Sequence, residues 1–260
     1  MKSKLKTQYE TADNLNARIN LHEKYSVNKQ GFHEWVFEKM NLKNGMKILE
    51  CGCGPGALWY KNKKEIPTNS NVTLVDKSTG MLKTAKENIG DIINTEFQFI
   101  HGDVQKLPFD NNTFDIVIAN HMLYHVEDIE KAISECKRVL KPLGSFFCST
   151  FGKNHLCELN SLTRQYILLP KQRTSDRFCL ENGCYIILKA FGNVLLELHI
   201  DALKVTNAQD LIDYILSSSY AQEQLVGKLR EQFETEIMKK LANEKVINIM
   251  KDAGLFIAKK

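Results

Sequence analysis

Features that are scarce or absent in this 260-residue chain exclude several classes of protein. The net charge is only +4, whereas a dedicated nucleic-acid binder needs a more basic, patterned surface. No apolar run is long enough to span a membrane. The charged start MKSKLKTQYE lacks the apolar stretch that follows in a signal peptide. We therefore expect a cytoplasmic protein without a membrane span.

Metal-ligand spacing is also missing, although the chain has seven cysteines. No Cys-x-x-Cys motif occurs, and zinc sites need closely spaced ligands of that kind. Cys51 and Cys53 lie in a glycine-rich turn, while Cys136 and Cys148 fall in predicted core elements. We predict mostly buried, reduced thiols and no bound metal.

Apolar runs of strand length alternate with helical patterns in the first 150 residues. The predicted strands are 47–51, 72–75, 97–100, 114–119 and 145–149, and the predicted helices between them are 56–65, 81–89 and 128–140. This alternation predicts an α/β fold with a doubly wound, mostly parallel sheet that helices cover on both faces. Farther on, we predict helices at 154–168, at about 180–191 and over most of 207–251, and strands at 194–200 and 255–258.

Polar side chains stand at or just after the ends of four predicted strands. They are Glu50, Asp76, Asp103 and Asn120. Ligands of doubly wound sheets bind beyond the carboxyl ends of the strands. Four such positions in succession are hard to explain by packing, so the sequence predicts a ligand site at this edge.

Three glycines at alternate positions, Gly52, Gly54 and Gly56, follow the first strand. Such a turn lets a ligand approach the backbone closely, but glycine turns also occur for structural reasons alone. The segment from Gly52 to Ala57 fits the dinucleotide pattern G-x-G-x-x-G/A, and Asp76 could accept hydrogen bonds from a ribose or cap a helix. Asp103, followed by a backbone N–H, suits the edge of adenine.

Four motifs occur in order between residues 46 and 148: ILECGCGPG, TLVDKSTGML, GDVQKLPFDNNTFDIVIANHMLYHVED and RVLKPLGSF. With them the chain resembles the class I S-adenosylmethionine-dependent methyltransferases, in particular the UbiE-like small-molecule group. The resemblance implies a Rossmann-like sheet of seven strands in the order 3-2-1-4-5-7-6, with strand seven antiparallel and formed by the terminal LFIAKK. The family often has aspartate where this chain has Glu50, which is a minor departure.

The resemblance also implies the site. The predicted cofactor-binding residues are Arg18, Tyr25, Glu50, Gly52, Cys53, Gly54, Gly56, Asp76, Lys77, Met81, Asp103, Val104, Asn120 and His121. Glu50 and the glycine turn would face the methionine part of S-adenosylmethionine, Asp76 the ribose, and Asp103 with Val104 the adenine. The remaining residues would flank the adenosine or the sulfonium, or cover the cofactor.

We predict three functional regions of the chain. Residues 1–40 would form an N-terminal helical lid, 41–150 the cofactor-binding core, and 151–260 a helical cap for the substrate with the final strands of the sheet. Arg18 and Tyr25 would belong to the lid, although a solvated helix face explains Arg18 almost equally well.

The implied reaction transfers a methyl group to an oxygen or nitrogen nucleophile of a small-molecule or peptide-like acceptor, leaving S-adenosylhomocysteine. His125 and Tyr124 are the candidate general bases, although His125 could simply organise the start of the next helix. An RNA methyltransferase and a non-catalytic S-adenosylmethionine-binding module are the alternatives. The sequence leaves a monomer and a homodimer open.

Overall fold

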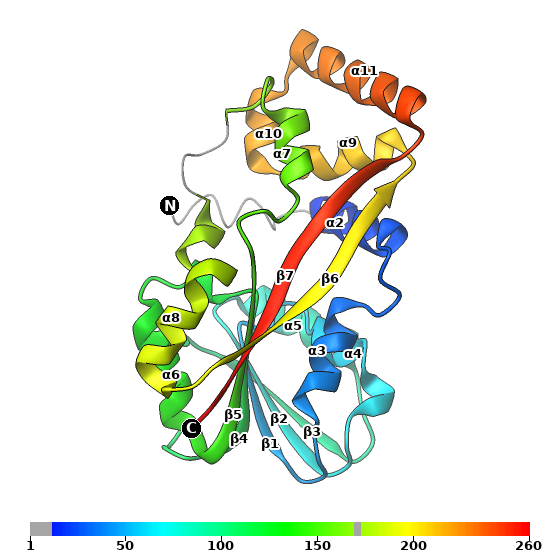
Figure 1. Ribbon diagram of the computed structural model, residues 1–260. Helices are drawn as coiled ribbons and strands as arrows, with labels where there is room; N and C mark the ends of the chain where they lie inside the picture. The colour runs from blue at the N-terminus through cyan, green and yellow to red at the C-terminus, as the bar shows by residue number, and fades with distance from the viewer. Residues whose placement is uncertain (1–11, 169–172) are drawn as a thin grey trace. The chain divides into compact units, whose positions relative to one another are not determined.

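The computed structural model describes residues 12–168 and 173–260 (Figure 1). These residues fall into two compact units. Unit 1 contains residues 12–29, 154–168 and 200–252, and unit 2 contains Gln30–Lys153, Arg173–His199 and Ala253–Lys260. The predicted division into lid, core and cap concerns function and stays a prediction.

A seven-stranded sheet in the order β3-β2-β1-β4-β5-β7-β6 organises unit 2, and β6 and β7 also contribute residues to unit 1. Its strands are β1 (Lys47–Cys51), β2 (Ser70–Asp76), β3 (Thr95–His101), β4 (Phe114–Asn120), β5 (Leu140–Phe151), β6 (Leu195–Val205) and β7 (Ile247–Lys259). The first five pair in parallel, whereas β7 pairs antiparallel with β5. The predicted strand order and the antiparallel seventh strand are confirmed.

Helices cover both faces of this sheet, as the alternating pattern predicted (Figure 1). On one face lie α3 (Phe32–Met40), α4 (Ala57–Tyr60) and α5 (Thr79–Ile89); on the other lie α6 (Ile129–Val139) and α8 (Leu180–Phe191). Local sequence starts two of these helices, because Ser78 Oγ accepts the Met81 N–H at the start of α5 and Asp128 accepts the Lys131 N–H at the start of α6.

The predicted helix at 56–65 is wrong in length. It is divided into the four-residue α4 and a 3₁₀ turn, η1 (Lys63–Glu65). The side-chain Nδ2 of Asn62 donates to the Leu58 carbonyl at 2.7 Å and thereby occupies an acceptor of the α-helical ladder. A helix this short provides no N-terminal anion site of its own.

Unit 1 is mainly helical. Its helices are α2 (Ala12–Tyr25), α7 (Cys157–Thr163), α9 (Ala208–Leu216), α10 (Ser219–Gln224) and α11 (Gly227–Glu244). They share a core with the neighbouring parts of β6 and β7. The predicted helix at 154–168 is shorter than expected. The prediction that most of 207–251 is helical is confirmed as far as Glu244. It was wrong beyond that residue, because Lys245 adopts a left-handed φ of 66° and β7 begins at Ile247.

None of the helices within 12–168 and 173–260 is long and apolar enough to cross a bilayer.

Two helical glycines should respond to alanine in opposite directions. A Cβ on Gly183 of α8 would lie 2.4 Å from Cε2 of the buried Phe256, whereas one on Gly80 of α5 would meet only Ser78 Oγ at 3.6 Å. We expect Gly183→Ala to lower the free energy of unfolding by about 1–3 kcal/mol through overpacking. Gly80→Ala should raise it by up to about 1 kcal/mol, because alanine favours the helix. Denaturant unfolding measures both, and a stabilised Gly183→Ala variant would contradict the packing.

Candidate functional site

The four predicted polar residues of the strand ends lie at one edge of the unit 2 sheet. Glu50 is in β1, Asp76 ends β2, Asn120 ends β4, and Asp103 follows β3 by two residues. Because these strands are parallel neighbours, their carboxyl ends meet at this edge; Cys51 pairs with Val75, and Asp76 with His101.

The glycine turn after β1 needs glycine for two different reasons. Gly52, Gly54 and Gly56 all have left-handed φ angles, of 66°, 53° and 78°. A Cβ on Gly52 would lie 2.9 Å from Met122 Cβ, and one on Gly56 would lie 2.9 Å from Ile89 Cδ1. A Cβ on Gly54 would have nothing within 4 Å. Gly54 therefore faces open space, while its neighbours pack against the protein.

The carboxylate of Asp76 joins this turn to the start of α5. Its Oδ2 accepts the Gly54 N–H at 2.9 Å, and its Oδ1 accepts the Ser78 N–H at 2.8 Å. Each carboxylate oxygen can accept a second hydrogen bond. Asp76 can thus hold the turn and still bind hydroxyl groups of a ligand.

Asp103 lies in a network of donors. Lys77 Nζ is 2.8 Å from its Oδ2, and Oδ1 accepts the backbone and side-chain N–H groups of Gln105 at 2.9 and 3.0 Å. Partial burial raises the pKa of Asp103, but the bonds from Lys77 and Gln105 outweigh it and lower the pKa to about 2. The carboxyl is therefore ionised at neutral pH and accepts hydrogen bonds only. Of its predicted neighbours in the site, Val104 is buried and Met81 half-buried.

Glu50 is a buried carboxyl, with 3% of its surface exposed. Its Oε2 accepts the indole N–H of Trp59 at 2.7 Å. Burial raises its pKa to about 8, although the Trp59 bond and the Asn120 amide act in the opposite direction and the charge of Asp76 adds to the rise. Glu50 thus holds a proton in much of the ligand-free protein near pH 7.

Asn120 and His121 are fixed to β5 by Ser149. Ser149 Oγ donates to Asn120 Oδ1 at 3.0 Å, and the His121 N–H donates to the Ser149 carbonyl at 3.1 Å. His121 has a φ of 47°, and its ring stacks on Phe151 with 4.1 Å between the centroids. The Asn120 Nδ2 is buried and makes no hydrogen bond of good geometry among the described residues, although it lies close enough to Glu50 to help lower the pKa of that carboxyl. Buried polar groups are rarely left unpaired, so this amide is a candidate ligand contact.

Comparison with known protein families identifies the segment that contains these polar residues. Residues 49–148 match the family model described as a methyltransferase domain. This segment is a methyltransferase domain. The resemblance to class I methyltransferases of the UbiE-like group is thereby confirmed for the part of the chain that carried its motifs.

Curated relatives match about half of the chain. The chain is 36% identical to a demethylmenaquinone methyltransferase of Staphylococcus aureus over 113 residues, which are 44% of this chain and 46% of the relative. It is 32% identical to the ubiquinone/menaquinone biosynthesis C-methyltransferase UbiE of Idiomarina loihiensis over 140 residues, which are 53% of this chain and 56% of the relative. The chain thus spans about half the length of the curated relatives it matches.

The fold extends beyond the methyltransferase domain. A phosphoethanolamine N-methyltransferase of Haemonchus contortus, solved in complex with S-adenosyl-L-methionine, is similar with a TM-score of 0.57. Its identity is 21%, and the match covers 98% of this chain and 59% of that one. At this identity the likeness shows the Rossmann-like fold alone.

The two candidate bases of the methyltransferase domain lie on a 3₁₀ turn, η2 (Leu123–His125), just after β4. Tyr124 is buried, and its ring meets that of His125 edge to face at 4.5 Å. His125 lies at the surface, although its surroundings desolvate the ring enough to lower its pKa, and the charge of Arg177 lowers it further. A lowered pKa favours the neutral imidazole, which is the form that can accept a proton. The role of His125 or Tyr124 as the general base stays a prediction.

Two predicted cofactor residues, Arg18 and Tyr25, belong to unit 1. Arg18 Nε donates to Ser217 Oγ at 2.9 Å, and the Tyr25 hydroxyl donates to Asp210 Oδ2. Both contacts stabilise the helices of that unit. The assignment of these residues to the cofactor stays a prediction.

Sequence reasoning missed three residues that shape the site of the methyltransferase domain. They are Trp59, Gln105 and Ser149, the partners of Glu50, Asp103 and Asn120. None of them belongs to a glycine or strand-end pattern. Only the position of Trp59 in the first turn after the glycines gave a signal.

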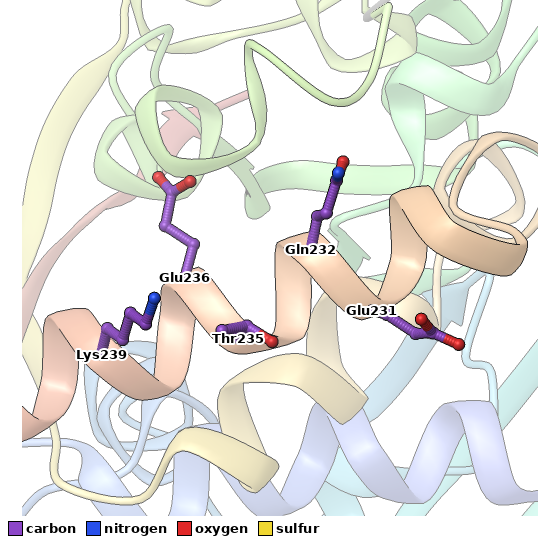
Figure 2. A pocket seen from close by; sticks show the side chains of 5 residues that line it. All are labelled: Glu231, Gln232, Thr235, Glu236 and Lys239. Carbon is purple, nitrogen blue, oxygen red and sulfur yellow. The ribbon is translucent and has the colours of Figure 1, made fainter.

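A hollow of about 460 Å³ lies on α11 in unit 1 and is outside the methyltransferase domain (Figure 2). Its lining consists of Glu231, Gln232, Thr235, Glu236 and Lys239. Glu236 is already bonded to Gln165 at 2.7 Å, and no predicted site residue lines the hollow. Among the described residues there is also no group of three or more histidine, cysteine or acidic side chains that could hold a metal.

Proposed function

We propose that the chain is a methyltransferase that uses S-adenosylmethionine to methylate a small-molecule or peptide-like acceptor. The observation that carries this proposal is the set of polar groups around the glycine turn. These groups lie at one edge of the sheet and within the matched segment 49–148. They are Glu50, Asp76, Asp103 and Asn120.

The residues present fit this cofactor. Gly54 faces open space beside the turn, and the buried Asn120 Nδ2 near Glu50 makes no hydrogen bond of good geometry among the described residues. Glu50 is a buried carboxyl, and no lysine or arginine is among the described groups that shift its pKa. A ligand with a positive charge would therefore suit it. A cavity for a neutral, purely apolar ligand would not need these groups.

In this proposal Asp76 accepts hydrogen bonds from the ribose, and Asp103 with Val104 binds the adenine. Lys77 and Met81 flank the adenosine, and Cys53 contributes to the turn that holds the methionine part. S-adenosylmethionine supplies a methyl group on positively charged sulfur, which is transferred in line to a nucleophile. The chain contributes by positioning the reactants, excluding water and accepting a proton, for which Tyr124 and His125 are the candidates.

The nature of the acceptor atom is part of the proposal. An oxygen or nitrogen nucleophile follows from the sequence resemblance. A carbon acceptor of the quinone type is a second candidate, because the UbiE relative is named a C-methyltransferase in ubiquinone and menaquinone biosynthesis. Incubation with methyl-labelled S-adenosylmethionine and, in turn, a phenol, an amine, a quinol and an RNA distinguishes the possible acceptors by which of them becomes labelled. Binding of the cofactor without turnover would favour the non-catalytic module. The cytoplasmic location and a monomeric or homodimeric state stay predictions.

Loss of Asp76 should abolish most cofactor binding. We expect Asp76→Ala to weaken the binding of S-adenosylmethionine and S-adenosylhomocysteine by about 100-fold or more, because charge-assisted hydrogen bonds contribute about 1.5–3 kcal/mol each. Asp91→Ala, which removes an exposed carboxylate of the same unit, should leave binding unchanged. Titration calorimetry measures both variants. A wild-type protein that ignores both ligands and binds a nicotinamide cofactor would overturn the proposed function.

A further inference from the structure

The surroundings of Glu50 contain acids but no described cation. Asp76 from β2 raises its pKa, and the thiols of Cys51 and Cys53 also interact electrostatically with it. The groups that favour its ionised form are the Trp59 indole from α4 and the Asn120 amide from β4, both of which are uncharged. No lysine, arginine or histidine is among the described groups that shift the pKa of this carboxyl.

A carboxylate buried in such surroundings is costly, because it has lost water and gained no opposite charge. The carboxyl avoids this cost by keeping its proton, which agrees with the direction of its pKa shift. A ligand that brings a positive charge changes the balance, since an ion pair favours the ionised form. Binding of such a ligand must then release the proton.

We propose that Glu50 exchanges its proton for the positive charge of the ligand, and that Trp59 sets the pH at which this exchange occurs. The inference rests on the proposed function, because S-adenosylmethionine and S-adenosylhomocysteine both carry an ammonium group. The proton passes from the Glu50 carboxyl to solvent, and the carboxylate left behind pairs with the ligand. No covalent bond to the ligand forms or breaks in this step.

Trp59 is a positioning residue in this exchange. Its ring is fully buried, and it meets Phe37 edge to face at 6.1 Å and Phe97 at 5.8 Å. These contacts fix the indole so that its N–H points at Glu50 Oε2. Phenylalanine at this position would keep an aromatic ring in the core and remove only the donor.

Calorimetry with S-adenosylhomocysteine tests the exchange in the wild-type protein. Titrations at one pH in two buffers of different ionisation enthalpy count the protons released. Measurements between about pH 6 and 7.5 keep the ligand amine protonated, because the neighbouring carboxylate holds its pKa above the value of about 7.7–8.0 of a peptide α-amino group. We expect about one proton released per ligand, and a binding constant that rises about tenfold per pH unit. The neutral analogue 5′-methylthioadenosine, which lacks the amino-acid part, should bind without releasing a proton.

Three variants separate the roles. Glu50→Gln should bind S-adenosylhomocysteine with no proton release and no pH dependence in this range. Trp59→Phe should still release a proton but should bind about tenfold more weakly at pH 7, because the loss of a donor to the carboxylate moves the exchange to higher pH. Trp35→Phe, at the only other tryptophan of the sequence, should keep the wild-type pH profile.

The outcomes distinguish this inference from the proposed function. Binding of S-adenosylhomocysteine without proton release would overturn the exchange and leave the function standing. Failure of the wild-type protein to bind it at any pH would overturn both. If Glu50→Gln does not fold, the proton counts of the wild-type protein and of Trp59→Phe decide the matter. An unshifted pH profile in Trp59→Phe would show that the indole only packs.

Discussion

Valine at position 54 should weaken the binding of S-adenosylhomocysteine by at least about 100-fold, which is about 2.7 kcal/mol. Gly54 has a φ of 53°, where a residue with a Cβ is strained by about 1–2 kcal/mol and a β-branched one more. The new side chain would also occupy the open space beside the turn. Any shift that relieves the strain moves the Gly54 N–H away from Asp76. Calorimetry gives the affinity directly.

Gly45→Val is the matched control for this variant. Gly45 also has a left-handed φ, of 76°, and a Cβ there would also have nothing within 4 Å. It precedes β1 and is not one of the predicted site residues. The melting temperature should fall by a similar amount in both variants, but only Gly54→Val should lose the binding of S-adenosylhomocysteine. Binding by Gly54→Val within threefold of the wild type would place the ligand elsewhere.

Titration of Glu50 alone should lower the free energy of unfolding of the ligand-free protein by about 1.6 kcal/mol as the pH rises from 6.5 to 8. The pKa of Glu50 is about 8 in the folded protein against an ordinary value of 4.5. Between these values the folded state binds the proton and the unfolded state does not. The stabilisation is therefore complete below pH 4.5 and is lost as the pH rises through 8, at about 1.4 kcal/mol per unit.

The window starts at pH 6.5 because buried histidines act in the opposite direction mostly below it, and by only about 0.4 kcal/mol each above it. Burial lowers the pKa of His22 and His33 from 6.5 to about 4, so stability rises with pH between those values. Denaturant unfolding at pH 6.5, 7.2 and 8 measures the Glu50 effect. Over this range the wild-type protein should lose about 1.6 kcal/mol relative to Glu50→Gln, in which only the opposite effect of the histidines remains. A variant that keeps the wild-type slope would assign the titration to another group.

Much of the sheet could be predicted because its five parallel strands are short apolar runs separated by helical patterns. The burial of β4, in which only Asp115 and Asn120 are not fully buried, explains why a continuous apolar stretch marked it. The parallel arrangement then placed Glu50, Asp76, Asp103 and Asn120 at one edge. Spacing along the chain was sufficient for these residues because strand ends are local features.

The later strands were harder to predict because only part of each is apolar. β7 was predicted from Leu255 to Ala258, but it begins at Ile247, and in its first four residues exposed positions alternate with buried ones. β6 was likewise predicted to end at Ile200 and continues to Val205. Residues 141–144 fall between the predicted helix 128–140 and the predicted strand 145–149, yet they belong to β5 and lie beside a register shift in its pairing with β4.

The partners of the site residues could not be predicted from spacing. Trp59 and Glu50 are joined through space by the fold of the glycine turn, and Ser149 meets Asn120 only because β5 pairs with β4. The Lys77 and Asp103 pair likewise spans 26 positions of the sequence. Contacts of this kind depend on strand pairing and turn geometry, which no local pattern encodes.

The strand order has a consequence for synthesis of the protein. β7 lies between β5 and β6 in the sheet, although β6 precedes it in the chain. During translation the eleven residues of β6 are made before the strand that connects them to the sheet. Leu198 and Ile200 of β6 remain 55% and 82% exposed even in the folded protein. An unpaired apolar strand is an aggregation hazard, so the nascent chain is most vulnerable in the interval before β7 emerges from the ribosome.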